Sequence, residues 1–251
     1  MFFAGSMDKF FFEPSQNAAE NVSQITSAFK SNIASIPFPN WNLTISGLEK
    51  LPLFSEFATT VSLENTFTSE YSEASFNDVS NQEVIQRQSV TQSFNPLIGL
   101  NITFKQFLGG NMTANLRINS STSNILTPSS NLIQENKTSD WNITANYAKA
   151  GFEIPLFGLS LKNDITFSLT VSKNLNQPVD YRFTPILGKE KLDGAGSTVT
   201  SFNPSVSYSL SSKVQLMVFY KYSKSEPTAG NATTQPRTTN EGGLNVRVTI
   251  Q

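Results

Sequence analysis

Residues 159–171 read LSLKNDITFSLTV, and apolar and polar side chains alternate along nearly the whole stretch. Phe167 and Val171 belong to the apolar set, and Thr166 and Thr170 to the polar set. Successive side chains of a β-strand point to opposite faces of its sheet, so this pattern predicts a strand with one apolar and one polar face. The strand is long, because typical strands in soluble proteins have about five or six residues.

The same period of two recurs from Trp41 to the end of the sequence and predicts an all-β chain. We expect about nine antiparallel strands in an up-and-down meander, most of them with cleanly separated faces. They are placed at residues 41–46, 57–67, 94–105, 111–118, 140–147, 159–171, 198–210, 214–222 and 244–251.

The residues before Trp41 follow a different period. Within 15–33, apolar residues recur at spacings of three and four, which predicts one short helix. Ser15 is a candidate N-cap, and Pro37 stops the helix. We therefore divide the chain into an N-terminal helical or loop segment, residues 1–40, and a β segment, residues 41–251.

The connections between the predicted strands alternate in length. Modest or tight links are expected at 47–56, 109–111, 149–158 and 211–212, and long polar loops at 69–90, 119–139, 173–197 and 223–241. Outer-membrane barrels keep short turns on the periplasmic side and long loops outside the cell. The pattern favours a transmembrane β-barrel, although a soluble antiparallel sandwich can show the same alternation along its strands.

Composition excludes several classes of function. The chain has no Cys and no His, so it has no disulfide scaffold, thiol nucleophile or histidine base. Its 18 basic and 19 acidic residues give a net charge of −1, which is unlike a nucleic-acid binder. We expect no catalytic residues, no cofactor, no metal and no nucleic acid. Charged residues make up 15% of the chain, against about 25% in ordinary globular domains, which suits a surface facing lipid.

The predicted strand count does not close a barrel by itself. Bacterial single-chain barrels have an even number of strands, and an isolated nine-stranded sheet would leave two edges unpaired in lipid. Each unpaired backbone group there costs several kcal/mol. We expect either a further strand within residues 1–40 or a chain that is the C-terminal part of a larger barrel.

Two sets of residues are candidates for functional surfaces. Six charged residues fall on the polar side of the alternation and could line an aqueous lumen or be solvated at its rims: Glu64, Lys105, Arg117, Lys162, Asp164 and Arg247. Six aromatic residues could form girdles at the membrane interfaces or pack in a sandwich core: Trp41, Trp141, Tyr147, Tyr208, Tyr220 and Tyr222.

Residues 36–48, IPFPNWNLTISGL, and 51–54, LPLF, carry a resemblance to a known family. They resemble the IP-x-PNW-x-(V/L)-T-Y-x-GL segment near the end of the large outer-membrane barrels called SprA in gliding bacteria and Sov in their oral relatives. The similarity continues through 94–100, 161–167 and 242–250, so it covers residues 36–251 in order. The family is many times longer and usually has Tyr where Ile45 stands.

This resemblance implies a translocon of the type IX secretion system, associated with gliding motility, in the outer membrane of a Gram-negative bacterium. The implied partners are membrane lipid, the remaining strands of a larger barrel or an upstream polypeptide, exported cargo and other secretion components. Two alternatives remain open, an independent porin-like barrel and a secreted β-sandwich adhesin.

Overall fold

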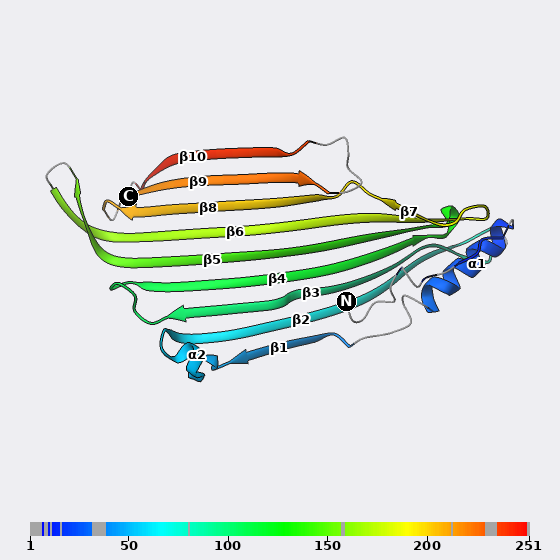
Figure 1. Cartoon of the computed structure of the whole chain (residues 1–251), viewed down its shortest axis with the longest axis horizontal. Helices are drawn as coiled ribbons and strands as arrows, with labels where there is room; N and C mark the ends of the chain where they lie inside the picture. Colours follow the sequence, from blue (N-terminus) through cyan, green and yellow to red (C-terminus); the bar gives the residue numbers. More distant parts are fainter. Residues whose placement is uncertain are drawn as a thin grey trace.

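A computed structural model describes residues 7, 10, 12–15, 17–31, 39–79, 81–156, 159–211, 213–228 and 235–249, with side chains undescribed at 18, 19 and 154–161. The described chain forms one antiparallel sheet and a short N-terminal helix, α1 (Ala18–Phe29) (Figure 1). The strands are β1 (Trp41–Ser46), β2 (Ala58–Asn77), β3 (Glu83–Phe104), β4 (Asn111–Thr127), β5 (Leu132–Leu156), β6 (Leu159–Thr184), β7 (Gly188–Asp193), β8 (Ser197–Ser209), β9 (Val214–Pro227) and β10 (Arg237–Val248). Short helical turns occur at η2 (Leu48–Lys50), α2 (Pro52–Ser55) and η3 (Pro128–Ser130).

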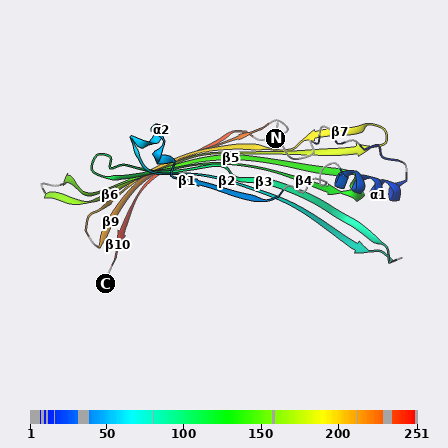
Figure 2. The ribbon, with the colours of Figure 1, turned by 90° about the horizontal axis from the view of Figure 1, so that it is seen from below.

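The strands are ordered β1-β2-β3-β4-β5-β6-β8-β9-β10, and the short β7 folds back on β6. Every pairing is antiparallel, so the predicted up-and-down all-β meander with an N-terminal helix is confirmed. Turned by 90°, the molecule is a single twisted layer of strands (Figure 2). The sheet is open, because β1 and β10 each pair on one side only within the described residues. Closure into a barrel therefore stays a prediction.

The strands are much longer than the alternation predicts. β5 has 25 residues and β6 has 26, and most of the predicted long loops at 69–90, 119–139 and 173–197 are paired strand. The expectation of long loops there was wrong. Ser, Thr and Asn occupy both faces of much of these stretches, for example at residues 119–124, so the apolar–polar alternation is lost while the backbone ladder continues. The alternation marked only part of each strand.

The two ends of the sheet differ as a result. The "turn end" carries the connections β1–β2, β3–β4, β5–β6 and β8–β9, and the "far end" carries the extensions of β2 to β6 (Figure 1). Extended strands rise about 3.3 Å per residue, so β5 and β6 are about 80 Å long.

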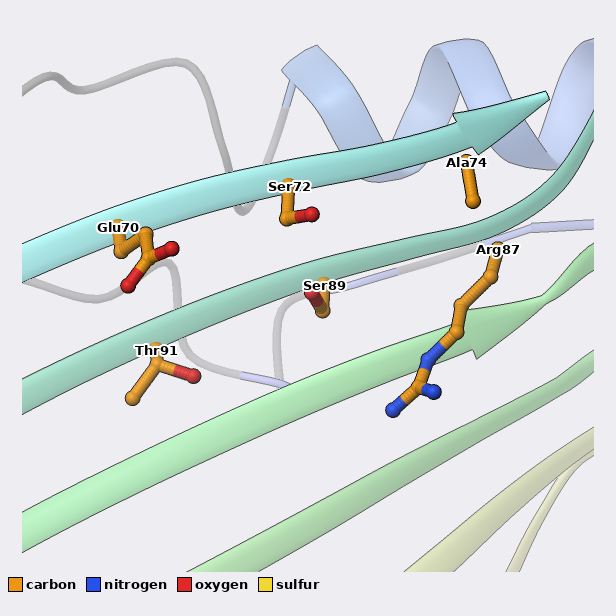
Figure 3. A pocket seen from close by; sticks show the side chains of 6 residues that line it. All are labelled: Glu70, Ser72, Ala74, Arg87, Ser89 and Thr91. Carbon is orange, nitrogen blue, oxygen red and sulfur yellow. The ribbon is translucent and has the colours of Figure 1, made fainter.

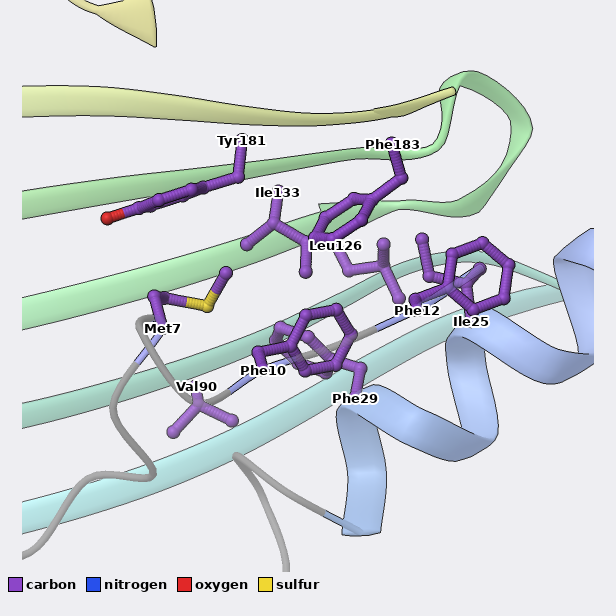
Figure 4. Packing of buried hydrophobic residues seen from close by; sticks show 10 residues of the cluster. All are labelled: Met7, Phe10, Phe12, Ile25, Phe29, Val90, Leu126, Ile133, Tyr181 and Phe183. Atoms are coloured by element: carbon purple, nitrogen blue, oxygen red, sulfur yellow. The ribbon is translucent and has the colours of Figure 1, made fainter. Parts of the chain in front are cut away.

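The helix prediction was right in kind, and α1 lies within the predicted 15–33. The Ser15 N-cap prediction was wrong, because α1 begins at Ala18 and its first backbone hydrogen bond runs from the Asn21 N–H to the Asn17 carbonyl. The Ser15 hydroxyl instead accepts a hydrogen bond from the Asn17 backbone N–H at 3.1 Å, ahead of the helix. One face of α1, together with Met7, Phe10 and Phe12, packs on the far end of the sheet (Figure 4). This "covered cluster" consists of Met7, Phe10, Phe12, Ile25, Phe29, Val90, Leu126, Ile133, Tyr181 and Phe183.

Candidate membrane-facing surface

The register of the strands sorts side chains into two faces. Cross-strand partners share a face, and one unbroken row of partners crosses the sheet from β1 to β9: Ile45, Leu63, Leu100, Leu116, Ile143, Val171, Phe202 and Tyr222. With its neighbours on alternate positions, this row forms an "apolar band" near the turn end. Its aliphatic members include Leu63, Leu100, Ile102, Leu116, Ile118, Ile143, Leu169, Val171, Val206, Val218, Leu244 and Val246.

Among the described residues, no second layer covers this band. Val218 is 51% exposed, Leu244 60% and Ile143 40%, whereas Val61 and Ile165 on the same face are buried. Contiguous exposed apolar surface of this kind marks a contact with a membrane or with another protein.

Aromatic rings border the band on the side toward the far end. Trp41 stacks on Phe67 at 4.5 Å between ring centroids, and Phe67 lies 4.8 Å from Phe94. The Trp41 indole N–H donates to Asn65 Oδ1 at 2.7 Å. Trp141 and Tyr222 continue this border on β5 and β9, with Tyr220 two residues closer to the turn end.

A second set of rings borders the band toward the turn end. Tyr147 lies 6.4 Å from Phe107 and 6.1 Å from Phe167, and Phe57 lies 5.8 Å from Phe104, measured between centroids. Tyr208 is on the same face, buried, and its hydroxyl donates to the Phe152 carbonyl at 3.2 Å.

The structure thus places all six predicted girdle residues on the apolar face. It also adds phenylalanines that the sequence analysis left out of the girdles, namely Phe57, Phe67, Phe94, Phe104, Phe107 and Phe167. These phenylalanines could have been predicted as girdle residues from their alternation with polar neighbours, but only Trp and Tyr were considered for the girdles.

The opposite face is polar and carries the predicted lumen residues. Glu64, Arg117, Lys162, Asp164 and Arg247 occupy positions of that face, whereas Lys105 lies one residue beyond the end of β3. Only one pair among these six is brought together in the described structure: Arg117 Nη2 lies 3.4 Å from Glu64 Oε2.

A hydrogen-bonded network surrounds that ion pair. The Asn101 amide donates to Glu64 Oε1 at 3.2 Å, and the Asn115 amide donates to Asn101 Oδ1. Both charged side chains are partly exposed, so the pair contributes at most about 1 kcal/mol. The arrangement makes a wettable, hydrogen-bonding surface.

The remaining candidates lie apart from this network. Lys105 Nζ donates to the Ser55 carbonyl at 2.6 Å near the β1–β2 connection. Asp164 Oδ1 accepts from the Gly151 N–H at 3.3 Å near the β5–β6 hairpin, with Lys162 two residues away. Arg247 is exposed on the edge strand β10.

A polar hollow of about 400 Å³ lies on the same face of β2 and β3 toward the far end (Figure 3). Its lining consists of Glu70, Ser72, Ala74, Arg87, Ser89 and Thr91. All of its lining except Thr91 falls within residues 69–90, which the sequence pattern predicts to be a loop, so the hollow was not predicted.

No group of three acidic, His or Cys residues that could hold a metal occurs among the described residues. Within the same residues, no helix is long and apolar enough to cross a membrane. The absence of catalysis, cofactor and nucleic acid stays a prediction.

No protein-family model matches the chain, and a search of curated proteins finds no significant match. The resemblance to the SprA and Sov family therefore stays a prediction.

Proposed function

We propose that this chain forms part of the wall of an outer-membrane β-barrel and, within that class, the C-terminal wall segment of a protein-export translocon like SprA and Sov. The observation that supports this is the apolar band, which crosses β1 to β10 on one face without a covering layer among the described residues. The chain acts as structure and does no chemistry.

The size of the strands fits a bilayer. A tilted transmembrane strand needs about 9–11 residues, and the hydrocarbon core is about 30 Å thick. On β6 the described apolar alternation runs from Ile165 to Val171, and the strand continues to Thr184. The remaining length at the far end then stands in water outside the membrane, where barrels carry their longer extensions.

The polar face supports a water-filled interior. Barrel strands alternate between lipid-facing and lumen-facing residues, and here the lumen side carries Asn, Ser, Thr and the Glu64–Arg117 pair. A lining of uncharged hydrogen-bonding groups offers passing cargo only weak contacts.

The open edges favour a segment of a larger wall over an independent porin. β1 and β10 run in the same direction, as the arrows in Figure 1 show, so they cannot pair antiparallel with each other. Antiparallel closure requires an odd number of additional strands between them. Those strands come from another part of the barrel.

The sandwich adhesin is the second structural candidate. A sandwich buries its apolar face against another sheet. The described residues supply no such sheet, and α1 covers only the far end.

Cysteine scanning tests the membrane face, because the natural chain has no Cys and each variant carries a single label. We pair Leu116→Cys with Asn115→Cys and Leu169→Cys with Thr170→Cys, each labelled with a nitroxide in the full chain reconstituted in phospholipid vesicles. Labels at 116 and 169 should collide mainly with dissolved oxygen, and labels at 115 and 170 with a water-soluble nickel chelate. Equal nickel accessibility at all four positions would contradict a lipid-facing band.

Two measurements separate a translocon wall from a porin. In planar bilayers, the full chain alone should give no uniform channel conductance, whereas a closed porin gives discrete equal steps. In the native cell, disrupting the gene should block export of secreted proteins and leave small-solute uptake unchanged. Uniform channels together with normal protein export would overturn the translocon proposal in favour of the porin.

A further inference from the structure

Two lysine side chains lie at the boundary between the apolar band and the far end, one on β6 and one on β9. Lys173 on β6 pairs with Trp141, and Lys224 on β9 lies two residues beyond Tyr222. Thr200 on β8 is the cross-strand partner of both lysines. Adjacent strands lie about 4.8 Å apart, so the two lysine backbones are about 10 Å apart on one face, with a hydroxyl between them.

Both lysine side chains are open to solvent on this face. Lys173 is exposed, and the Lys224 side chain is 38% exposed. In the row of Lys173, the partners on β5, β4 and β3 are Trp141, Ile118 and Ile98. In the next row toward the far end, Ser139 pairs with Ser120 and Ser120 with Phe94, so neither row places a carboxylate on these strands.

The nearest carboxylates lie farther from the band. Glu226 is two residues beyond Lys224, and its Oε1 is 2.6 Å from Lys224 Nζ. Lys137 on β5 is similarly held by Glu135, at 2.8 Å. An anionic group that approaches from the band meets Lys173 and Lys224 before it meets either carboxylate.

We propose that Lys173 and Lys224, with Thr200 between them, bind the phosphate of an anionic lipid headgroup in the leaflet that meets the far-end border of the band. This inference rests on the proposed membrane-facing role of the band. In membrane proteins, Trp and Tyr rings are enriched at the level of the lipid headgroups. Trp141 and Tyr222 at that level bring the adjacent Lys173 and Lys224 to the depth of the lipid phosphates. Basic residues at that depth attract anionic lipids.

The band also explains why a lipid, and not a free anion, is the ligand. A lipid whose acyl chains lie on Phe202, Val171 and their neighbours has its headgroup held next to the lysines. Free phosphate lacks that second contact and gains only the weak attraction of two solvated cations.

The test uses Trp141 as a local probe. The chain has two tryptophans, so Trp41→Phe leaves Trp141 as the single fluorophore. The full chain is reconstituted in phosphatidylcholine vesicles containing either bromine-labelled phosphatidylglycerol or bromine-labelled phosphatidylcholine. The anionic lipid should quench Trp141 at a severalfold lower mole fraction than the zwitterionic lipid does.

Variants then assign the preference to the lysines. Lys173→Gln and Lys224→Gln should each reduce the preference for the anionic over the zwitterionic lipid about fivefold, which corresponds to the usual attraction of one basic residue to an anionic surface. Glu226→Gln should increase it, because the competing carboxylate is removed. The matched control is Lys221→Gln, on the opposite face of β9, where the lysine lies 3.7 Å from Glu241; it should leave the preference unchanged.

Three results would overturn this proposal. They are equal quenching by the two lipids, a loss in Lys221→Gln as large as in Lys173→Gln, and removal of the preference by inorganic phosphate at constant ionic strength. If neither brominated lipid quenches Trp141, the proposed membrane role of the band fails instead, so the two failures are distinguishable.

Discussion

The apolar band and the covered cluster lie on the same face of the same sheet, yet their surroundings are opposite. Leu126 and Ile133 in the cluster are 0% exposed, whereas Leu244 in the band is 60% exposed. The difference is the cover: α1 with Met7, Phe10 and Phe12 lies on the cluster, whereas no second sheet of described residues lies on the band. The chain covers apolar surface at the far end and leaves it bare where we propose that lipid takes over.

A polar belt separates these two regions. On β5, Ser139, Lys137 and Glu135 lie between Trp141 at the border of the band and Ile133 in the cluster, all on one face. The two regions are therefore distinct surfaces. This predicts that each responds to a different perturbation.

Two phenylalanines on β6 give the sharpest contrast. Phe183 is 1% exposed and meets Phe10 edge-on at 5.3 Å between centroids. Phe183→Ala should weaken docking of α1 by about 3–5 kcal/mol, the usual cost of truncating a buried Phe. Trypsin cleavage after Lys30, followed in the full chain in detergent micelles, should become at least tenfold faster.

The matched control for Phe183→Ala is Phe167→Ala, which changes the same residue type on the same strand and face but at the turn-end border of the band. It should leave the cleavage rate after Lys30 unchanged. Equal acceleration in both variants would show that the band and the cluster are one cooperative unit.

A charge in the band should be costly only in a bilayer. Leu169→Arg places a guanidinium on the apolar face, which costs about 2–4 kcal/mol near the middle of a membrane. Folding of the full chain into phospholipid vesicles, measured by denaturant titration, should show this loss. Thr170→Arg on the polar face is the control, and a loss of equal size there would remove the distinction between the faces.

A smaller effect is expected from Lys189, which binds the backbone of the segment that precedes α1. Lys189 Nζ donates to the Met7 carbonyl and, at 3.4 Å, to the Phe10 carbonyl, and it lies 4.9 Å from the Tyr181 ring centroid. Lys189→Met should cost about 1–2 kcal/mol, because charged hydrogen bonds are lost.

The Lys189→Met effect should appear as faster amide exchange in residues 7–15 of the full chain. Lys191→Met is the comparison, since Lys191 is 56% exposed in a surface pair with Asp193. Exchange that is unaffected by Lys189→Met would mean that apolar packing alone holds the segment.

The sequence revealed the band because its two environments impose a period of two, as in residues 165–171. It did not reveal the far-end strands, because Ser120 to Ser123 and their neighbours are polar on both faces. The strand residues of the covered cluster could have been predicted from the sequence. Ile133 lies an even number of residues from Trp141, and Tyr181 an even number from Val171, so they share the face of the band. The segment that covers them is distant in sequence, and strand periodicity carries no information about it.

The smallest expected effect is a pH dependence of the docking of α1 at the covered cluster, with no such dependence in the apolar band. Hydrogen bonds from the Gln88 amide and the Tyr71 hydroxyl lower the pKa of Glu73 below 4.5. Burial, and then the bond to Glu73, raises the pKa of Tyr71 to about 12. Lys30, the first residue after α1, has its Nζ 5.7 Å from the centroid of the Tyr71 ring, so these groups report on the docked helix.

A lowered carboxyl pKa stabilises the fold above pH 4.5, and this contribution disappears as the pH falls through the folded pKa. A raised tyrosine pKa stabilises it below pH 10, and this contribution disappears between pH 10 and 12. Amide exchange in α1 should therefore rise slightly below pH 4.5, after correction for intrinsic rates, and Glu73→Gln should remove that rise. The nitroxide at position 116 in the band should show no change over the same acid range, because no carboxylate belongs to the band. An equal acid response at both places would mean that the acid effect is global and not carried by Glu73.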